Sequence, residues 1–173
     1  KRKLSINHIN KLLSSGAKII DVGGESTRPG AKDISSNKEW NRIKTVLKFL
    51  KNKKCIVSLD TRKSFVMKKA SKIKIDLLND VSGLNYDPNT IEFLNKTKKS
   101  FVLHHMKGIP KNMQIKPSYK NVLLDIYDFF ETKLKYLRTK GIKHSNIILD
   151  PGIGFGKNLK HNITLLKKIS IFH

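Results

Sequence analysis

The sequence predicts an α/β fold in which parallel strands are joined by helices. Short apolar runs of the kind that form buried strands alternate with segments whose apolar residues recur at helical spacing. No two-residue hairpin turn separates successive runs, so neighbouring strands need crossover connections, which helices supply. Each apolar run also ends in polar residues. Both a doubly wound sheet and a (β/α)8 barrel fit this order.

The periodicity places each element in turn. The expected strands are the short apolar runs at residues 17–22, 55–59, 75–78, 101–103 and 146–149. The expected helices are the segments with apolar residues three or four positions apart, at residues 6–13, 37–50, 65–70, 88–94, 122–137 and 162–173.

Capping and stop signals support these bounds. Ser36 or Asn37 is expected to cap the second helix, because a side-chain oxygen there can accept from a free backbone N–H. Asp87 followed by Pro88 reads as a cap and a first-turn proline. Gly141 is expected to stop the long fifth helix.

Composition and charge limit the classes of function. The 173 residues form one expected domain, with 36 basic and 13 acidic residues and a net charge of +23. The basic residues are 31 lysines and only 5 arginines, whereas nucleic-acid surfaces favour arginine. Lysine, isoleucine and asparagine, whose codons are A/T-rich, make up 65 of the 173 residues. Coding bias therefore explains the charge, and we expect no nucleic-acid partner.

The location is expected to be cytoplasmic. No apolar run reaches the roughly 18 residues that a membrane span needs, so no membrane association is expected. Cys55 is the single cysteine, so the sequence holds no disulfide framework. The single cysteine fits a reducing compartment.

Polar residues at the strand ends predict a shared site. In parallel α/β folds, ligands bind where the strands end, and a buried strand gains nothing from an unpaired carboxylate. An alternative is that each group only caps the next helix. The residues concerned are Asp21, Asp60, Asn79, Asp80, His104, His105 and Asp150. The two histidines are neighbours on one strand and point to opposite faces, so we do not expect them to share a metal ion.

Two glycine-rich loops add further chemistry. In the loop over residues 23–31, Ser26, Thr27 and Arg28 supply hydroxyls and a guanidinium, which suit a phosphate or pyrophosphate. The loop over residues 150–157 is not a P-loop, because its glycines are too close to the lysine. Its Phe155 can stack on an aromatic substrate or simply pack beneath the loop.

Taken together, these motifs resemble the dihydropteroate synthase family. They occur in the family's order between residue 17 and about residue 165. The matching strings are Asp21-Val22-Gly23-Gly24-Glu25-Ser26-Thr27-Arg28-Pro29-Gly30-Ala31, Ser58-Leu59-Asp60-Thr61, Asn79-Asp80-Val81-Ser82-Gly83, His105-Met106-Lys107-Gly108-Ile109-Pro110 with Met113-Gln114, and Leu149-Asp150-Pro151-Gly152 through Lys157. The first and last strings carry the most specific part of the resemblance.

The resemblance implies a fold, a reaction and a cofactor. It implies a (β/α)8 TIM barrel, of which residues 1–173 would form a single pterin-binding domain with about five of the eight strands. The implied enzyme is a transferase of folate biosynthesis and a sulfonamide target. It condenses p-aminobenzoate with 6-hydroxymethyl-7,8-dihydropterin pyrophosphate to give 7,8-dihydropteroate and pyrophosphate, with Mg2+ as cofactor. These small molecules are its expected partners.

The resemblance also assigns roles to individual residues. Asp60, Asn79 and Asp150 would bind the pterin ring, and Thr27 with Arg28 would contact the pyrophosphate. Met106 would form a wall of the pterin pocket, and Phe155 would contact the benzoate ring. No residue attacks covalently; Asp60, Asp150 and Arg28 would act by positioning and charge stabilisation.

Three departures and two alternatives accompany the resemblance. The family's first strand, with its magnesium-associated asparagine, and its last two strands are expected to lie outside this chain. We therefore expect no metal ligand here, little activity from the 173 residues alone, and a homodimer at full length. His104 stands where the family often has a hydrophobic residue. The alternatives are a methyltetrahydrofolate-type pterin-binding methyltransferase and a decayed, non-catalytic basic fragment.

Overall fold

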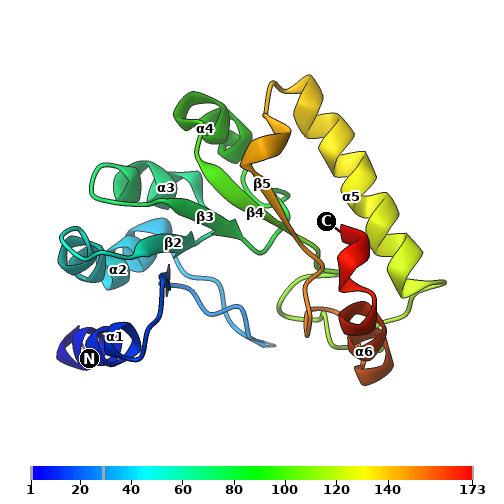
Figure 1. Ribbon diagram of the computed structural model, residues 1–173, viewed down its shortest axis with the longest axis horizontal. Coiled ribbons are helices and arrows are strands. Elements are labelled where there is room, and N and C mark those ends of the chain that lie inside the picture. The colour runs from blue at the N-terminus through cyan, green and yellow to red at the C-terminus, as the bar shows by residue number, and fades with distance from the viewer. Residues whose placement is uncertain (1, 29, 173) are drawn as a thin grey trace.

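One parallel five-stranded sheet organises the molecule, as the computed structural model of residues 2–28 and 30–172 shows (Figure 1). The strands are hydrogen-bonded in chain order, β1-β2-β3-β4-β5. They are β1 (Ile19–Gly23), β2 (Ile56–Asp60), β3 (Leu77–Asp80), β4 (Ser100–His104) and β5 (Ile147–Asp150). A doubly wound sheet reverses its strand order at a switch point. The consecutive order is that of a barrel wall, so the doubly wound alternative is wrong.

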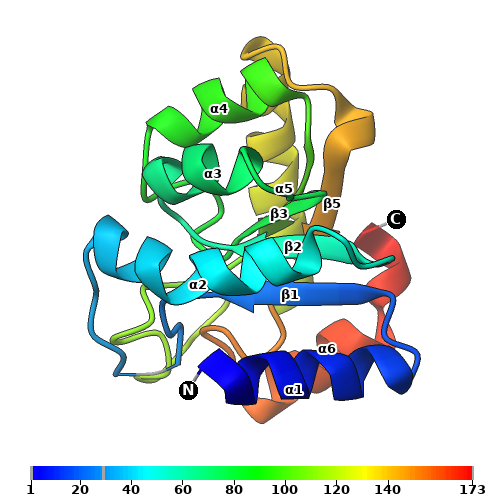
Figure 2. The same ribbon diagram turned by 90° about the vertical axis from the view of Figure 1, so that its left-hand side faces the viewer.

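A helix follows each strand, as predicted. Figures 1 and 2 show α2, α3, α4 and α5 following one another around one face of the curved sheet. The helices are α1 (Arg2–Ser14), α2 (Ser36–Leu50), α3 (Ser64–Ser71), α4 (Asn89–Thr97), α5 (Val122–Thr139) and α6 (Leu159–Lys167), with short 3-10 turns η1 (His144–Asn146) and η2 (Ile169–Phe172). None of those described is both long enough and apolar enough to cross a membrane.

The core lies between the helices and the outer face of the sheet. Alternate strand residues point to this face, and helix residues spaced three or four apart meet them. Fully buried members of this core are Leu47, Leu50, Val57, Leu59, Met67, Leu78, Phe101, Leu103, Ile126, Leu137 and Leu165. Each buried side chain of this size stabilises the fold by about 1.5–3 kcal/mol. The core therefore holds the sheet in place from one side only.

The opposite, inner face of the sheet is less covered. Ile19 and Ile56 are register partners on this face and are 50% and 45% exposed. Ile148 on β5 is 50% exposed. Polar residues replace these apolar ones toward the carboxyl ends of the strands. The inner face is thus apolar near the amino ends of the strands and polar at their carboxyl ends. A ligand can be held at this polar edge, the rim of the inner face.

Several predicted bounds needed correction. The cap of α2 is Ser35, whose hydroxyl accepts from the Lys38 N–H (3.3 Å), and not Ser36 or Asn37. The third strand begins at Leu77 and not at residue 75. α4 begins at Asn89, one residue later than predicted, with Pro88 in the cap position and with helical dihedral angles, while Asp87 accepts from the Asn89 N–H (3.0 Å).

The last helix was predicted to run from residue 162 to residue 173, which is wrong at both ends. Asn158 and His161 form a reciprocal capping box that starts α6 at Leu159. The helix ends at Lys167 and a 3-10 turn follows, while His173 lies outside the described residues.

Leucine truncation on α5 tests the location of the core. Leu137 is fully buried, whereas Leu124 on the same helix is 53% exposed. Leu137→Ala is expected to lower the free energy of unfolding by about 2–5 kcal/mol because it leaves a cavity. Leu124→Ala should lower it by less than about 0.5 kcal/mol. Urea unfolding measures both, and equal losses in the two variants would place the core elsewhere.

Candidate functional site

Strand register assembles the polar rim. Asp60 on β2 is the register partner of Asn79 on β3, and His104 on β4 is the partner of Asp150 on β5. Partners on neighbouring strands point to the same face of a sheet. These four side chains therefore line one edge of the inner face, as expected. Asp21 lies two residues before the end of β1, opposite Ser58, and so sits deeper in the sheet than predicted.

Asp80, a further strand-end group, faces away from this rim. Asp80 follows Asn79 directly and is fully buried on the helix side, where it accepts from the Ser82 N–H (2.8 Å) and hydroxyl (2.6 Å). Burial raises the pKa of Asp80 to about 6, although the Ser82 bonds oppose the shift. The expectation that Asp80 shares the cleft is wrong, because side chains alternate along a strand.

The carboxyl group of Asp60 lies in a crowded negative field. Burial, and after it the nearby charges of Asp21, Glu39, Asp80 and Glu25, together raise its pKa to about 7. Burial also raises the pKa of Asp21, against hydrogen bonds from the Ser58 and Asn79 side chains. Near neutral pH, Asp60 can therefore either accept or donate a proton.

Asp150 has the opposite electrostatic character. Its Oδ1 accepts from the Gly152 N–H (2.8 Å), and its Oδ2 lies 3.0 Å from His104 Nδ1. Burial raises the pKa of Asp150, but the hydrogen bonds from His104 and the Gly152 N–H and the positive charge of Lys157 outweigh it, and the pKa falls below its usual value. The side chain is still 43% exposed. It is thus an ionised acceptor with a set orientation.

Phe155 packs rather than standing free. It is half-buried, and its ring meets that of His104 edge to face with centroids 4.6 Å apart. The loop that carries it is held by Tyr119, whose hydroxyl donates to the Gly156 carbonyl (2.9 Å). Packing and ligand contact are compatible here because part of the ring remains exposed. Met106 is likewise half-buried at the start of the loop after β4.

Lys157 is a member of this region that sequence reasoning missed. It is buried, and its Nζ lies 3.1 Å from His105 Nδ1 and donates to the Phe155 carbonyl (2.9 Å). Burial lowers the pKa of Lys157 to about 8. Burial, then the lysine charge, lowers the pKa of His105 to about 3. His105 is thus a neutral partner of the lysine, and it shares no ligand position with His104.

The first loop leaves its predicted anion contacts accessible. Thr27 is half-buried and Arg28 is exposed. Within residues 2–28 and 30–172, the Arg28 guanidinium forms no salt bridge. The Gly30 N–H donates to the Pro110 carbonyl (3.3 Å), which ties this loop to the loop after β4, while Pro29 lies outside the described residues.

A buried charge network anchors the same loop, and the sequence did not predict it. Lys63 Nζ lies 2.7 Å from Glu25 and 2.8 Å from Glu39. Arg62 pairs with Glu25 (2.9 Å) and covers the Tyr86 ring at 3.9 Å. These partners come from three loops and one helix, and one lysine among 31 gives no signal by itself. The network joins the loop of Thr27 and Arg28 to the end of β2.

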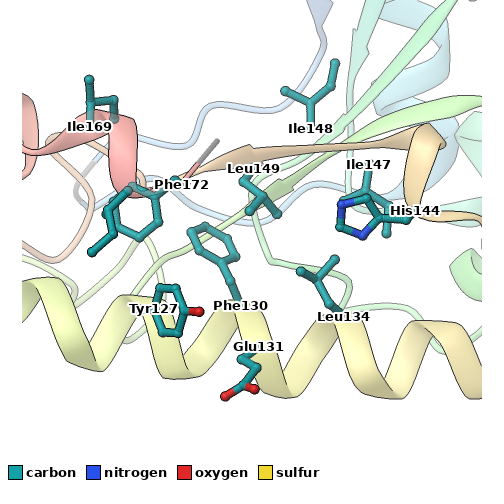
Figure 3. A pocket seen from close by; sticks show the side chains of 11 residues that line it. Tyr127, Phe130, Glu131, Leu134, His144, Ile147, Ile148, Leu149, Ile169 and Phe172 are labelled. Carbon is teal, nitrogen blue, oxygen red and sulfur yellow. The ribbon is translucent and has the colours of Figure 1, made fainter.

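An apolar cavity lies away from these residues. It has a volume of about 570 Å³ and opens between α5, β5 and η2 (Figure 3). Figure 3 shows Phe130, Leu134, Ile148, Leu149 and Phe172 among the side chains that line it. This lining is mostly apolar and includes none of the predicted site residues, so it lacks the converging polar groups of a pterin site.

The described part of the chain contains no cluster of side chains that could by itself coordinate a metal ion. Within it, no three side chains of His, Cys, Asp or Glu come together in a way that could hold an ion. The chemistry that follows is assigned to side chains alone.

Comparison with known proteins identifies the fold and the family. The family "Pterin binding enzyme" matches residues 2–173. The chain belongs to this family. Dihydropteroate synthase of Haemophilus influenzae is 39% identical to this chain over 165 residues, which cover 95% of the chain and 60% of the relative. The chain thus spans about 60% of the length of the curated relative that it matches.

Solved structures agree with the family assignment. A Yersinia pestis dihydropteroate synthase in a sulfonamide drug complex matches with a TM-score of 0.92 and 39% identity, and the match covers 97% of this chain and 61% of the solved one. A Clostridium difficile dihydropteroate synthase, in the presence of pteroic acid, matches with a TM-score of 0.87 and 34% identity, covering 98% and 62%. Both support the assignment of this chain as part of a TIM barrel.

Removal of the lysine from the buried network tests its importance. Lys63→Met leaves Glu25 and Glu39 without their shared cation, so we expect the free energy of unfolding to fall by roughly 3–5 kcal/mol. The exposed Lys68 on α3 provides the matched control, and Lys68→Met should change stability by less than about 0.5 kcal/mol. Urea unfolding compares them. A Lys63→Met loss no larger than that of the control would mean that the network does not stabilise the fold.

The raised pKa of Asp60 makes a pH-dependent prediction. Because the folded-state pKa is about 7 and the ordinary value is 3.8, the native state binds more protons between these values. Stability from this group therefore falls as pH rises from about 4 to 7.

Asp60→Asn removes that loss, and we expect it to stabilise the protein at pH 8 by roughly 1–3 kcal/mol with little change at pH 4. Unfolding curves at both pH values measure this, with Asp128→Asn on the exposed side of α5 as control. An Asp60→Asn gain that is equal at both pH values would contradict the assigned titration.

Proposed function

We propose that this protein acts as a dihydropteroate synthase, which condenses p-aminobenzoate with 6-hydroxymethyl-7,8-dihydropterin pyrophosphate. The observation that carries the proposal is the placement of Asp60, Asn79 and Asp150 on one rim of the inner sheet face. The names of the relatives favour the synthase over a pterin-binding methyltransferase. We also propose that residues 1–173 belong to a single domain.

Recognition of the pterin ring follows from three different polar groups. The ring presents fused donors and acceptors, so a complementary site needs both kinds of group. Asp150 is an ionised acceptor, and the Asn79 amide has an Oδ1 that is buried without a protein partner. Asp60 can donate from its protonated form. A ring that donates to the Asn79 Oδ1 is favoured because this buried atom otherwise stays unsatisfied.

Bond changes in the proposed reaction are simple. The C–O bond between the pterin methylene and the pyrophosphate breaks, and the electron pair leaves with the pyrophosphate. The aniline nitrogen then forms the new C–N bond and loses a proton to solvent. Thr27 and Arg28 would stabilise the departing negative charge, and Met106 and Phe155 would hold the two rings. The protein acts by positioning, and no side chain forms a covalent bond.

The remaining expectations are proposals as well. Magnesium would assist departure of the pyrophosphate, but no cage of ligands within residues 2–28 and 30–172 supports a site for it here. The homodimer and the cytoplasmic location, which rest on the sequence and the resemblance, remain predictions.

Binding of pteroic acid, which contains both rings, tests this function. We expect the purified protein to bind it saturably, as measured by calorimetry. Asp150→Asn should weaken binding by at least roughly tenfold because it removes a charged hydrogen-bond partner. Asp128→Asn, on the exposed side of α5, should leave the affinity unchanged. Absence of saturable binding, or equal affinity in Asp150→Asn and the wild type, would reject the proposed site.

A further inference from the structure

His104 occupies an unusual position in the rim. Its side chain is 3% exposed, so it does not offer a surface to a ligand. As register partner of Asp150, it lies beside that carboxylate on the inner face. Its Nδ1 is 3.0 Å from Asp150 Oδ2. The same ring meets Phe155 edge to face at 4.6 Å. One side chain thus contacts both the predicted pterin-binding carboxylate and the predicted benzoate-binding ring.

The hydrogen-bond pattern defines the tautomer of His104. Asp150 is ionised and can only accept, so Nδ1 carries the proton. In the neutral ring, Nε2 is then an acceptor, and it is buried with no hydrogen-bond partner among the described residues. Nε2 lies 3.0 Å from the point where a Cβ on Gly152 would be, so a larger residue at 152 would press on the ring.

The Asp150 carboxylate is consequently held at both oxygens. The Gly152 N–H holds Oδ1 at 2.8 Å, and His104 holds Oδ2. A carboxylate with two fixed donors keeps one orientation, yet at 43% exposure it still has free lone pairs for a ligand. Preorganised acceptors of this kind bind better than mobile ones because less conformational entropy is lost on binding.

We propose that His104 is a positioning residue that orients the Asp150 carboxylate through Nδ1–H and the Phe155 ring through its own ring, so that one buried side chain prepares both halves of the site. The identity of the ligand in this inference rests on the proposed function. The role of His104 in holding Asp150 and Phe155 rests on the geometry of these three residues. His104 acts through Asp150 and Phe155, because its buried ring leaves no atom for the substrate.

Three variants separate the hydrogen bond from the packing. His104→Asn keeps an N–H near the position of Nδ1 but loses the ring, whereas His104→Leu loses both. His104→Gln places the N–H near the position of Nε2 and serves if His104→Leu does not fold. The control is His8→Leu, at an exposed position on α1. Two probes report on the two halves: 6-hydroxymethylpterin for the pterin part alone, and pteroic acid for both rings.

The affinities are expected to follow the contacts. His104→Leu should bind 6-hydroxymethylpterin roughly tenfold more weakly than the wild type, and His104→Asn should stay within about twofold. Both variants should lose part of the extra affinity for pteroic acid, because both lack the ring that supports Phe155. His8→Leu should match the wild type. If His104→Leu binds both probes like the wild type, or if His104→Asn is as weak as His104→Leu for the pterin, the proposal is overturned.

A measurement without ligand keeps this inference apart from the proposed function. Carboxyl 13C NMR follows the titration of Asp150, whose pKa should rise in His104→Leu and stay low in His104→Asn. The 15N spectrum of wild-type His104 should show the Nδ1-protonated tautomer. If neither probe binds the wild type, the proposed function fails, and the Asp150 titration still decides the role of His104. An unchanged Asp150 pKa in His104→Leu would overturn that role.

Discussion

The in-register pairing of five parallel strands is the constraint on which the site depends. Because side chains alternate along a strand, pairing Asp60 with Asn79 and His104 with Asp150 brings all four to the same face. A slip of one residue on any strand would send its polar group into the helix-packed core. The buried outer-face residues, with Leu59 fully buried among them, oppose such a slip. Packing on one face therefore sets the chemistry on the other.

The rim brings together negative charges that repel one another, and the fold resolves this in two ways. Around Asp60 the repulsion remains, and burial together with this repulsion raises the pKa of Asp60. Around Glu25 and Glu39, the buried Lys63 supplies a shared cation. The Asp150 carboxylate accepts hydrogen bonds from the Gly152 N–H and from His104. One carboxyl group is thus close to its protonated form at neutral pH while another is ionised, which suits a ligand edge with both donors and acceptors.

The loops at this end of the sheet are linked through buried polar contacts rather than through a large apolar core. Lys63 joins the first loop to α2 and β2, and Lys157 joins the fifth loop to the end of β4. His104 extends the second link to Phe155. Hydrogen-bonded contacts of this type specify orientation, which apolar packing does less well. The arrangement explains how glycine-rich loops can present Phe155 in a defined place.

Local sequence determined the order of elements, the parallel class and the residues at the strand ends, because periodicity and capping act over only a few residues. Motif strings also located Asp60, Asn79 and Asp150 as candidates. Tertiary structure alone decided the consecutive strand order and the register, since both depend on pairs far apart in the chain. It also decided that Asp80 faces the core and that the Lys63 network forms. Such contacts join residues more than 20 positions apart, where no local pattern distinguishes one lysine from another.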